Sequence, residues 1–99
     1  MSDLNGLVMI ARKGGYVIVG QDKLAGYEKK LYLLLLDETA GKSLVREMNF
    51  LAHKKNIPLC IVKNLPEISK IPNCKVIGIK NKNLSDEILK VLDEVSHKN

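Results

Sequence analysis

The sequence predicts an α/β protein in which helices cover both faces of a four-stranded, mostly parallel or mixed sheet, a three-layer α/β/α sandwich. One observation predicts this fold class, and a second predicts the number of domains. Helical and strand-like hydrophobic patterns alternate along the whole chain, and such alternation is typical of strands that are connected by helices. The chain has 99 residues and no repeat, linker or low-complexity stretch, so we expect a single domain over residues 1–99.

The first thirty residues are expected to contain a helix, a strand and a weaker helical stretch. Apolar residues at 4, 7, 8 and 11 have helical spacing. Ser2 is the predicted N-cap of this helix, and Gly14-Gly15 its predicted end. Residues 16–19 form a short β-branched run that closes at Gly20 and predicts a strand. Residues 21–30 fit a short helix, which Gly26 weakens.

Two strands and a helix are expected in the middle of the chain. Residues 31–36 are apolar without alternation and end at Asp37, which favours a central parallel strand buried on both faces. Apolar residues at 44, 48, 51 and 52 have helical spacing, and Thr39 or Ser43 is expected to cap that helix. Residues 57–62 predict a third inner strand.

The last third of the chain predicts one more strand and one more helix. Pro66 and Pro72 bracket a short turn of helix at most, and residues 75–79 predict a fourth strand. Ser85 is the predicted N-cap of the final helix, with a hydrophobic staple between Leu84 and Leu89.

Charge is distributed unevenly along the chain. Its 16 Lys and Arg and 11 Asp and Glu give a formal net charge of +5. Residues 1–82 hold fourteen basic and seven acidic residues, and residues 83–99 hold two and four, so the two parts carry +7 and −2. The positive charge of residues 1–82 favours a polyanionic partner, because contacts to phosphates release counterions. The alternative is an ordinary lysine-rich face in contact with solvent.

Several classes of protein are not indicated by the sequence. No segment has the roughly 18–20 apolar residues of a membrane span, and the N-terminus lacks the pattern of a secretory signal, so we expect a cytoplasmic protein. Cys60 and Cys74 are interpreted as buried thiols, with a disulfide left open. His53 and His97 stand isolated among lysines, and we therefore expect no metal site and no cofactor.

No catalytic motif is recognisable, and we expect no enzyme and no small-molecule substrate. Gly41-Lys42-Ser43 stands where a phosphate-binding loop would, but that motif needs glycine at position 36, which is Leu36 here. Asp37-Glu38 is interpreted as loop and cap chemistry. An enzyme that uses Asp37-Glu38 together with Gly41-Lys42-Ser43 remains an alternative.

Several short motifs occur in an order and spacing that resemble a known family. They are Leu7-x-x-x-Ala11-Arg12-Lys13-Gly14, Gly20-Gln21-Asp22, the run of residues 33–38 and Lys55-Asn56-Ile57-Pro58. Together they resemble the kink-turn-binding ribosomal protein superfamily (the archaeal L-seven-Ae and eukaryotic L-thirty-e type), and most closely its small bacterial members. The order of elements agrees over essentially the whole chain.

This resemblance implies an α/β/α sandwich that binds structured RNA, kink-turn-like or ribosomal, with ribosomal proteins as further partners. The RNA surface would combine the turn after the first strand with the loop after the third strand. The turn comprises Gly20, Gln21, Asp22 and Lys23, and the loop comprises Lys63, Asn64 and Leu65. Candidate phosphate contacts are Arg12, Lys13, Lys29 and Lys30.

The turn departs from the family's motif, G-x-N-E-x-x-K. Only Gly20 is kept, because Asp22 stands for Asn, Lys23 for Glu and Gly26 for Lys. An aspartate only accepts hydrogen bonds and repels phosphate, although it can accept from guanine. Two alternatives follow: that Gly20 is merely a strand-to-helix turn with Asp22 as N-cap, and that the chain is a protein-interaction module that has lost RNA recognition.

Overall fold

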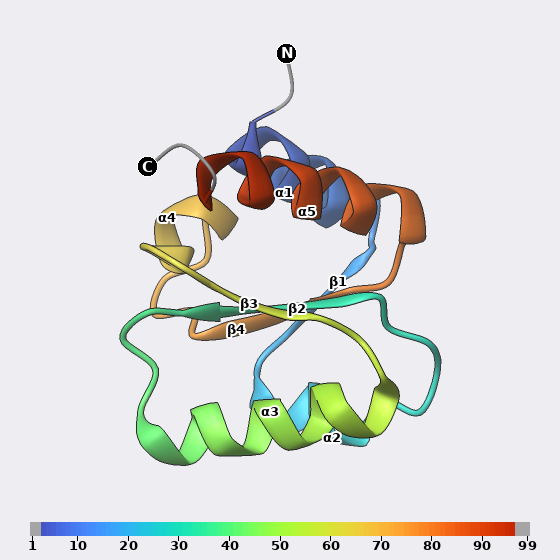
Figure 1. Ribbon diagram of the computed structural model, residues 1–99, viewed down its shortest axis with the longest axis vertical. Coiled ribbons are helices and arrows are strands. Elements are labelled where there is room, and N and C mark those ends of the chain that lie inside the picture. Colours follow the sequence, from blue (N-terminus) through green and yellow to red (C-terminus); the bar gives the residue numbers. More distant parts are fainter. Residues whose placement is uncertain (1–2, 97–99) are drawn as a thin grey trace.

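A computed structural model of the protein describes residues 3–96 as a three-layer α/β/α sandwich (Figure 1). The sheet forms the middle layer, with α1, α4 and α5 on one face and α2 and α3 on the other. The predicted fold class is therefore confirmed. In chain order the elements are α1 (Leu4–Lys13), β1 (Val17–Val19), α2 (Gln21–Gly26), β2 (Leu33–Asp37), α3 (Lys42–Lys55), β3 (Leu59–Val62), α4 (Leu65–Ser69), β4 (Val76–Ile79) and α5 (Lys82–Ser96).

The sheet is mixed, with the strand order β1-β4-β2-β3. β2 and β3 are parallel, with Leu34 opposite Leu59, and β4 is antiparallel to both β1 and β2. The antiparallel direction of β4 arises because the short α4 does not carry the chain across the sheet. β4 therefore begins at the end of the sheet where β3 ends. We call this side, where β1, β2 and β3 end and β4 begins, the carboxyl end of the sheet, and the opposite side its amino end.

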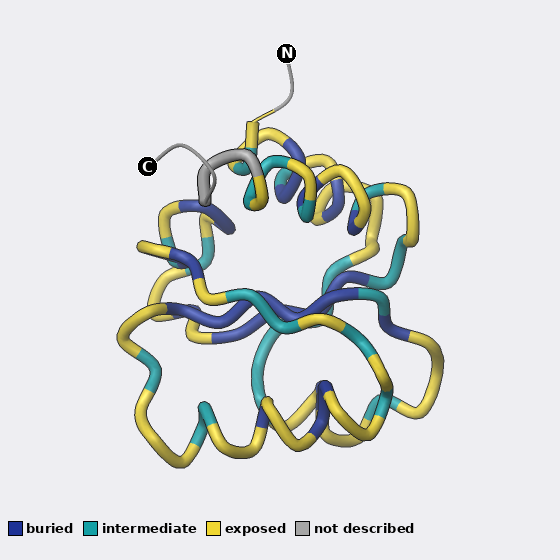
Figure 2. Tube along the Cα trace, viewed as in Figure 1, coloured by how far each residue is buried: buried dark blue, intermediate teal, exposed yellow. Residues whose placement is uncertain are grey.

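β2 is the centre of the hydrophobic core. All five of its residues are buried, which confirms the predicted strand buried on both faces. Leu33 and Leu35 pack with the buried side chains of α1, α4 and α5. Leu34 and Leu36 pack with those of α2 and α3. Figure 2 shows this buried strand between exposed outer helix faces, so the six-residue apolar run fills both cores.

β3 lies at the edge of the sheet, so the prediction of an inner third strand was wrong. β4 inserts between β1 and β2, and this leaves β3 with β2 as its neighbour. The side chain of Ile61 is consequently 60% exposed, whereas Val62 is buried.

The beginnings of α1 and α3 differ from the predicted caps. The side chain of Asp3 caps α1 by accepting a hydrogen bond from the Gly6 amide at 2.7 Å; the predicted cap, Ser2, lies outside the described residues. Gly15 has φ 78° and ends this helix as predicted. The N-cap of α3 is Gly41, so capping by Thr39 or Ser43 was wrong, because the Thr39 hydroxyl donates to Asp37 instead.

α5 begins three residues before its predicted cap. Asn81 precedes the helix, and its side-chain oxygen accepts a hydrogen bond from the Leu84 amide at 2.9 Å, as an N-cap does. Ser85 is buried inside the first turns of α5. The predicted staple between Leu84 and Leu89 is wrong for the same reason, since Leu84 already belongs to the helix.

Cys60 and Cys74 are free thiols. Cys74 is buried and Cys60 half-buried, and this burial raises the pKa of both thiols. Within residues 3–96, no helix has the length and apolar character needed to cross a membrane.

Candidate nucleic-acid interface

The two segments predicted to contact RNA both lie at the carboxyl end of the sheet. Gly20 directly follows β1 and Lys63 directly follows β3, and these strands run in the same direction. Three strand spacings of ~4.8 Å separate β1 from β3, so the two segments lie roughly 14 Å apart. The end of β2 and the beginning of β4 lie between them and contribute Asp37 and Lys75.

Gly20 makes the turn from β1 into α2. Its φ of 97° and ψ of 150° lie in a region that is essentially restricted to glycine. A Cβ atom there would meet nothing within 4 Å, so backbone conformation and not space requires the glycine. The Gly20 amide donates to the Val76 carbonyl at 3.1 Å. Gly20 itself is the N-cap of α2, which makes the alternative assignment of that cap to Asp22 wrong.

The side chains that follow Gly20 have different surroundings. Gln21 donates from Nε2 to Oε2 of Glu47 at 2.5 Å, and this bond joins α2 to α3. Asp22 and Lys23 are exposed, and neither makes a side-chain hydrogen bond or ion pair within the described residues. These two side chains are therefore available to a ligand, whereas the Gln21 amide is already bound.

The loop after β3 exposes two of its three predicted residues. Lys63 and Asn64 are exposed, and Asn64 adopts a left-handed conformation with φ 56°. Its Nδ2 donates to Oε2 of Glu67 at 2.5 Å. Leu65 is fully buried in the core, so its side chain does not form part of the exposed surface.

Asp37 is a buried carboxylate that holds this loop in place. It accepts hydrogen bonds from the Leu65 amide at 2.7 Å, from the Thr39 amide at 3.0 Å and from the Thr39 hydroxyl. Nζ of Lys75 lies 3.9 Å from Oδ2 of Asp37. Burial by itself would raise the pKa of Asp37, but the hydrogen bonds and Lys75 together lower it below its usual value. The interpretation of Asp37 as loop chemistry is thus confirmed.

The four candidate phosphate contacts do not gather around Gly20. Arg12 donates from Nη1 to the carbonyls of Ser69 at 3.2 Å and Lys70 at 3.4 Å, where its charge suits the C-terminus of α4. Lys13 is exposed in the last turn of α1. The other two, Lys29 and Lys30, precede β2 and therefore lie at the amino end of the sheet.

Lys75 is a residue of this surface that the sequence analysis missed. With Gly20, Gln21 and Asn73 it lines an open depression of about 290 Å³ at the carboxyl end of the sheet. Its Nζ donates to the Thr39 hydroxyl at 2.5 Å. In the sequence, the one feature that could have indicated Lys75 was its position just before the predicted fourth strand. A parallel fourth strand, however, would have placed Lys75 at the amino end.

The carboxyl end of the sheet is almost neutral. Segments 20–23, 37–42, 63–67 and 70–75 hold five lysines and four carboxylates, a net charge of +1. Within the described residues, no group of three or more His, Cys, Asp or Glu side chains is placed to hold a metal ion. The surface therefore offers amide, carboxylate and ammonium groups for hydrogen bonds, without a strong positive field.

Comparison with known proteins shows the fold of this chain. No protein family model and no curated protein sequence matches it. Its structure is similar to that of a protein with unknown function from Bacillus halodurans, with a TM-score of 0.81, 19% sequence identity and coverage of 94% of this chain and 99% of that one. It is also similar to the 15.5kD RNA binding protein of Giardia lamblia, with a TM-score of 0.69, 18% identity and coverage of 94% and 83%. The chain therefore shares its fold with a protein that binds RNA.

Proposed function

We propose that this protein binds structured RNA, kink-turn-like or ribosomal, without catalysing a reaction. One observation carries the proposal: Gly20–Lys23 and Lys63–Asn64, which are far apart in the sequence, lie on the same end of the sheet. The motif resemblance predicted these two segments as the RNA surface, and the shared fold of an RNA-binding protein supports the same function.

The charges of this surface indicate how it would bind. With a net charge of only +1, it would depend more on contacts to bases and sugars than on attraction to phosphates. Asp22 would accept from a base N–H, such as those of guanine. Lys23, Lys63 and Lys75 offer three phosphate contacts, and Lys42 and Lys70 at the same end of the sheet raise the limit to five. Log Kd would therefore change with log salt with a slope of about 3 to 4.5.

Filter binding at two salt concentrations tests this function. We expect a kink-turn RNA to bind more tightly than an unrelated RNA duplex at both concentrations. Equal affinities for the two RNAs at both concentrations would contradict specific recognition.

A charge reversal tests whether the carboxyl end of the sheet is the surface used. Lys23→Glu should weaken kink-turn binding roughly tenfold at low salt, because a phosphate contact is replaced by repulsion. Lys90→Glu, on α5, is the matched control and should leave the affinity within about twofold. Equal affinity of Lys23→Glu and the unchanged protein would assign binding to another surface.

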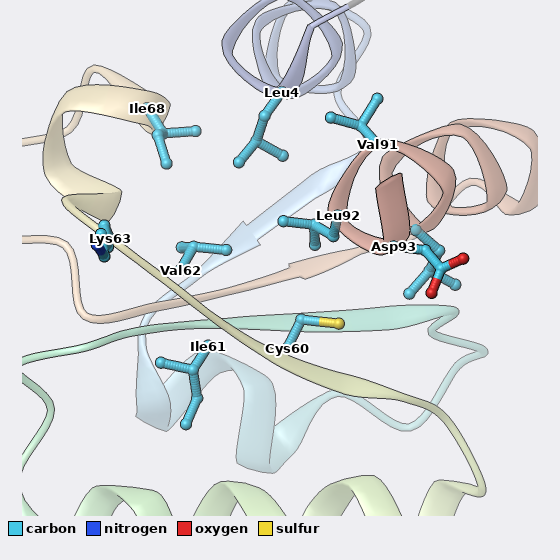
Figure 3. A pocket seen from close by; sticks show the side chains of 10 residues that line it. Leu4, Cys60, Ile61, Val62, Lys63, Ile68, Val91, Leu92 and Asp93 are labelled. Atoms are coloured by element: carbon cyan, nitrogen blue, oxygen red, sulfur yellow. The ribbon is translucent and has the colours of Figure 1, made fainter. Parts of the chain in front are cut away.

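A protein-interaction module is the second candidate function, and the free edge of β3 favours it. β3 has β2 as its neighbour in the sheet, and exposed strand edges can pair with an extended segment of a partner. Cys60 and Val62 point toward an open apolar hollow of about 650 Å³, which is also lined by Leu4, Ile61 and Leu92. The side chain of Ile61 lies on the opposite side of β3 from those of Cys60 and Val62 (Figure 3). The changed motif positions 22, 23 and 26 agree with a loss of RNA recognition.

Affinity purification distinguishes the two functions. A protein-interaction module should co-elute with ribosomal or processing proteins and without nucleic acid. Ile61→Lys should abolish the co-elution, because a charge on an edge strand opposes pairing. Ile10→Lys is the matched control, since Ile10 on α1 is similarly exposed, at 57% against 60%. RNA in every eluted complex, together with an unchanged Ile61→Lys complex, would contradict this function.

A further inference from the structure

Three basic segments meet at the amino end of the sheet, opposite the surface just described. Tyr27–Tyr32 leads into β2, His53–Ile57 leads into β3, and Lys80–Lys82 follows β4 (Figure 1, right side of the sheet). Hydrogen bonds join these segments to one another and to β4. Nζ of Lys55 donates to the Lys29 carbonyl at 3.2 Å, and the Tyr32 amide donates to the Ile79 carbonyl at 2.9 Å.

The positive charge of the protein is concentrated here. The three segments contain six lysines and one acidic residue, Glu28, a net charge of +5 that equals the formal net charge of the whole chain. Lys82 forms an ion pair with Asp86, with Nζ 3.0 Å from Oδ2. The other five lysines form no ion pair with a carboxylate within residues 3–96: Lys29, Lys30, Lys54, Lys55 and Lys80. Unpaired ammonium groups at this density attract a polyanion.

All three tyrosines of the chain lie at this same end. Tyr16 precedes β1, and its carbonyl accepts from the Lys80 amide at 2.7 Å. Nζ of Lys30 lies 5.6 Å from the ring centroid of Tyr32. Nζ of Lys55 and Nζ of Lys80 lie 6.0 Å and 5.9 Å from the ring centroid of Tyr27. Lysines interleaved with aromatic rings are typical of surfaces that bind single-stranded nucleic acid, because phosphates meet the cations and bases stack on the rings.

This composition favours RNA over a membrane surface. Peripheral membrane binding combines basic residues with large apolar side chains that enter the lipid. The exposed large hydrophobic side chains of the described residues are Ile10, Tyr16, Phe50 and Ile61. Of these, Tyr16 alone lies at the amino end, whereas Ile10, Phe50 and Ile61 lie outside the basic segments. Tyrosine hydroxyls and ammonium groups instead match phosphate and base edges.

We propose that the amino end of the sheet binds a single-stranded RNA segment, separate from the RNA at the carboxyl end. One protein molecule then bridges two RNA segments across the sheet. Binding at the amino end does not depend on recognition at the carboxyl end, because the two surfaces share no residue. The lysines without an ion pair allow up to five phosphate contacts, which give a salt slope of about 3.5 for a single strand.

Salt-dependent binding of a 20-nucleotide oligouridine tests the amino end directly. The double variant Lys30→Gln/Lys80→Gln should lower the affinity at least tenfold at low salt and reduce the salt slope by roughly 1.4, since two phosphate contacts are lost. The matched control is Arg46→Gln/Lys90→Gln, which removes the same charge from two exposed cations on α3 and α5 that lie outside the three basic segments. The control should retain the slope and stay within about threefold in affinity. Equal losses in the two double variants, or no loss in the first, would overturn the proposal.

A capture experiment tests bridging. Kink-turn RNA is immobilised, and labelled oligouridine should be retained only when the protein is added. Lys30→Gln/Lys80→Gln should abolish retention of the label while the protein still binds the kink-turn RNA. Retention of the label by this variant would contradict bridging.

Failure at one surface can be told apart from failure at the other. If the protein does not recognise kink-turn RNA, the proposed function fails, but the oligouridine affinity and its salt slope still report on the amino end. Vesicles that contain phosphatidylserine complete the test. Binding to these vesicles that is lost in Lys30→Gln/Lys80→Gln, without any binding of oligouridine, would overturn the proposal in favour of a membrane surface.

Discussion

The carboxylate of Asp37 accepts a hydrogen bond from the backbone amide of Leu65 at 2.7 Å, and this bond joins the end of β2 to the first residue of α4. The Leu65 amide is one of the donors that the beginning of a helix leaves without a partner. Asp37 is buried, so its charge is tolerated only because several donors surround it. The bond therefore fixes the position of Lys63 and Asn64, which belong to the candidate RNA surface.

Removal of this carboxylate should strongly destabilise the protein. Asp37→Ala leaves the buried Leu65 amide without an acceptor and also removes both bonds from Thr39, so we expect a loss of about 3 kcal/mol in the free energy of unfolding. Urea denaturation measures it. The matched control is Glu38→Ala, since Glu38 is the exposed neighbour and should change the free energy by less than about 0.5 kcal/mol. Equal effects of the two substitutions would contradict the role of Asp37.

The stability should depend on pH through the same group. The pKa of Asp37 is lower in the folded protein than its ordinary value of 3.8, so in acid the unfolded chain binds this proton more readily. Stability from Asp37 is therefore fully present above pH 4 and is lost as the pH falls through the folded pKa. Urea midpoints measured from pH 6 down to pH 2 should decline less steeply for Asp37→Asn than for the unchanged protein. Parallel curves would contradict the lowered pKa.

Two glycines of the same short helix give opposite predictions. Gly20→Ala should cost about 1–3 kcal/mol of stability, because alanine is strained at φ 97° and ψ 150°. Gly26, at the other end of α2, has no positive φ, and a Cβ there would meet nothing within 4 Å. Gly26→Ala should therefore be neutral or stabilise the protein by up to about 1 kcal/mol. Thermal unfolding of both variants measures the difference, and equal melting temperatures would contradict the assignment of strain to Gly20.

The order of the elements could be predicted from the sequence because it depends on local hydrophobic patterns. The run from Leu31 to Leu36 indicated a buried central strand, and the spacing of Met48 and Leu51 indicated the helix on one of its faces. The direction of β4 could not be predicted in this way. It depends on whether the chain between Val62 and Val76 crosses the sheet, which is a property of tertiary packing and not of any local pattern.

The candidate site was predictable only in part for the same reason. Gly20 and Lys63 were assigned to one surface by the family resemblance, which combines the turn after the first strand with the loop after the third. Lys29 and Lys30 were grouped with them by charge alone, and charge carries no information on which end of a strand a residue precedes. Lys75 was missed because its location depends on the antiparallel direction of β4.

The start of α5 offers a test in which the sequence pattern and the structure disagree. The pattern assigned the N-cap to Ser85, and substitution of a capping serine by alanine costs about 1 kcal/mol. In the structure the cap is Asn81, whose side chain accepts from the Leu84 amide. The hydroxyl of Ser85 is buried and has no hydrogen-bond partner within the described residues.

Ser85→Ala should therefore leave stability unchanged or raise it slightly, because it removes a buried polar atom that has no partner. Asn81→Ala should lower the free energy of unfolding by about 1 kcal/mol, since the Leu84 amide then loses its acceptor. Urea denaturation of the two variants under identical conditions measures both changes. A loss on Ser85→Ala as large as that on Asn81→Ala would return the cap to Ser85. A larger loss on Asn81→Ala than on Ser85→Ala would confirm that α5 begins at Lys82. Lys80 would then lie just before the cap of this helix, in the basic segment at the amino end of the sheet.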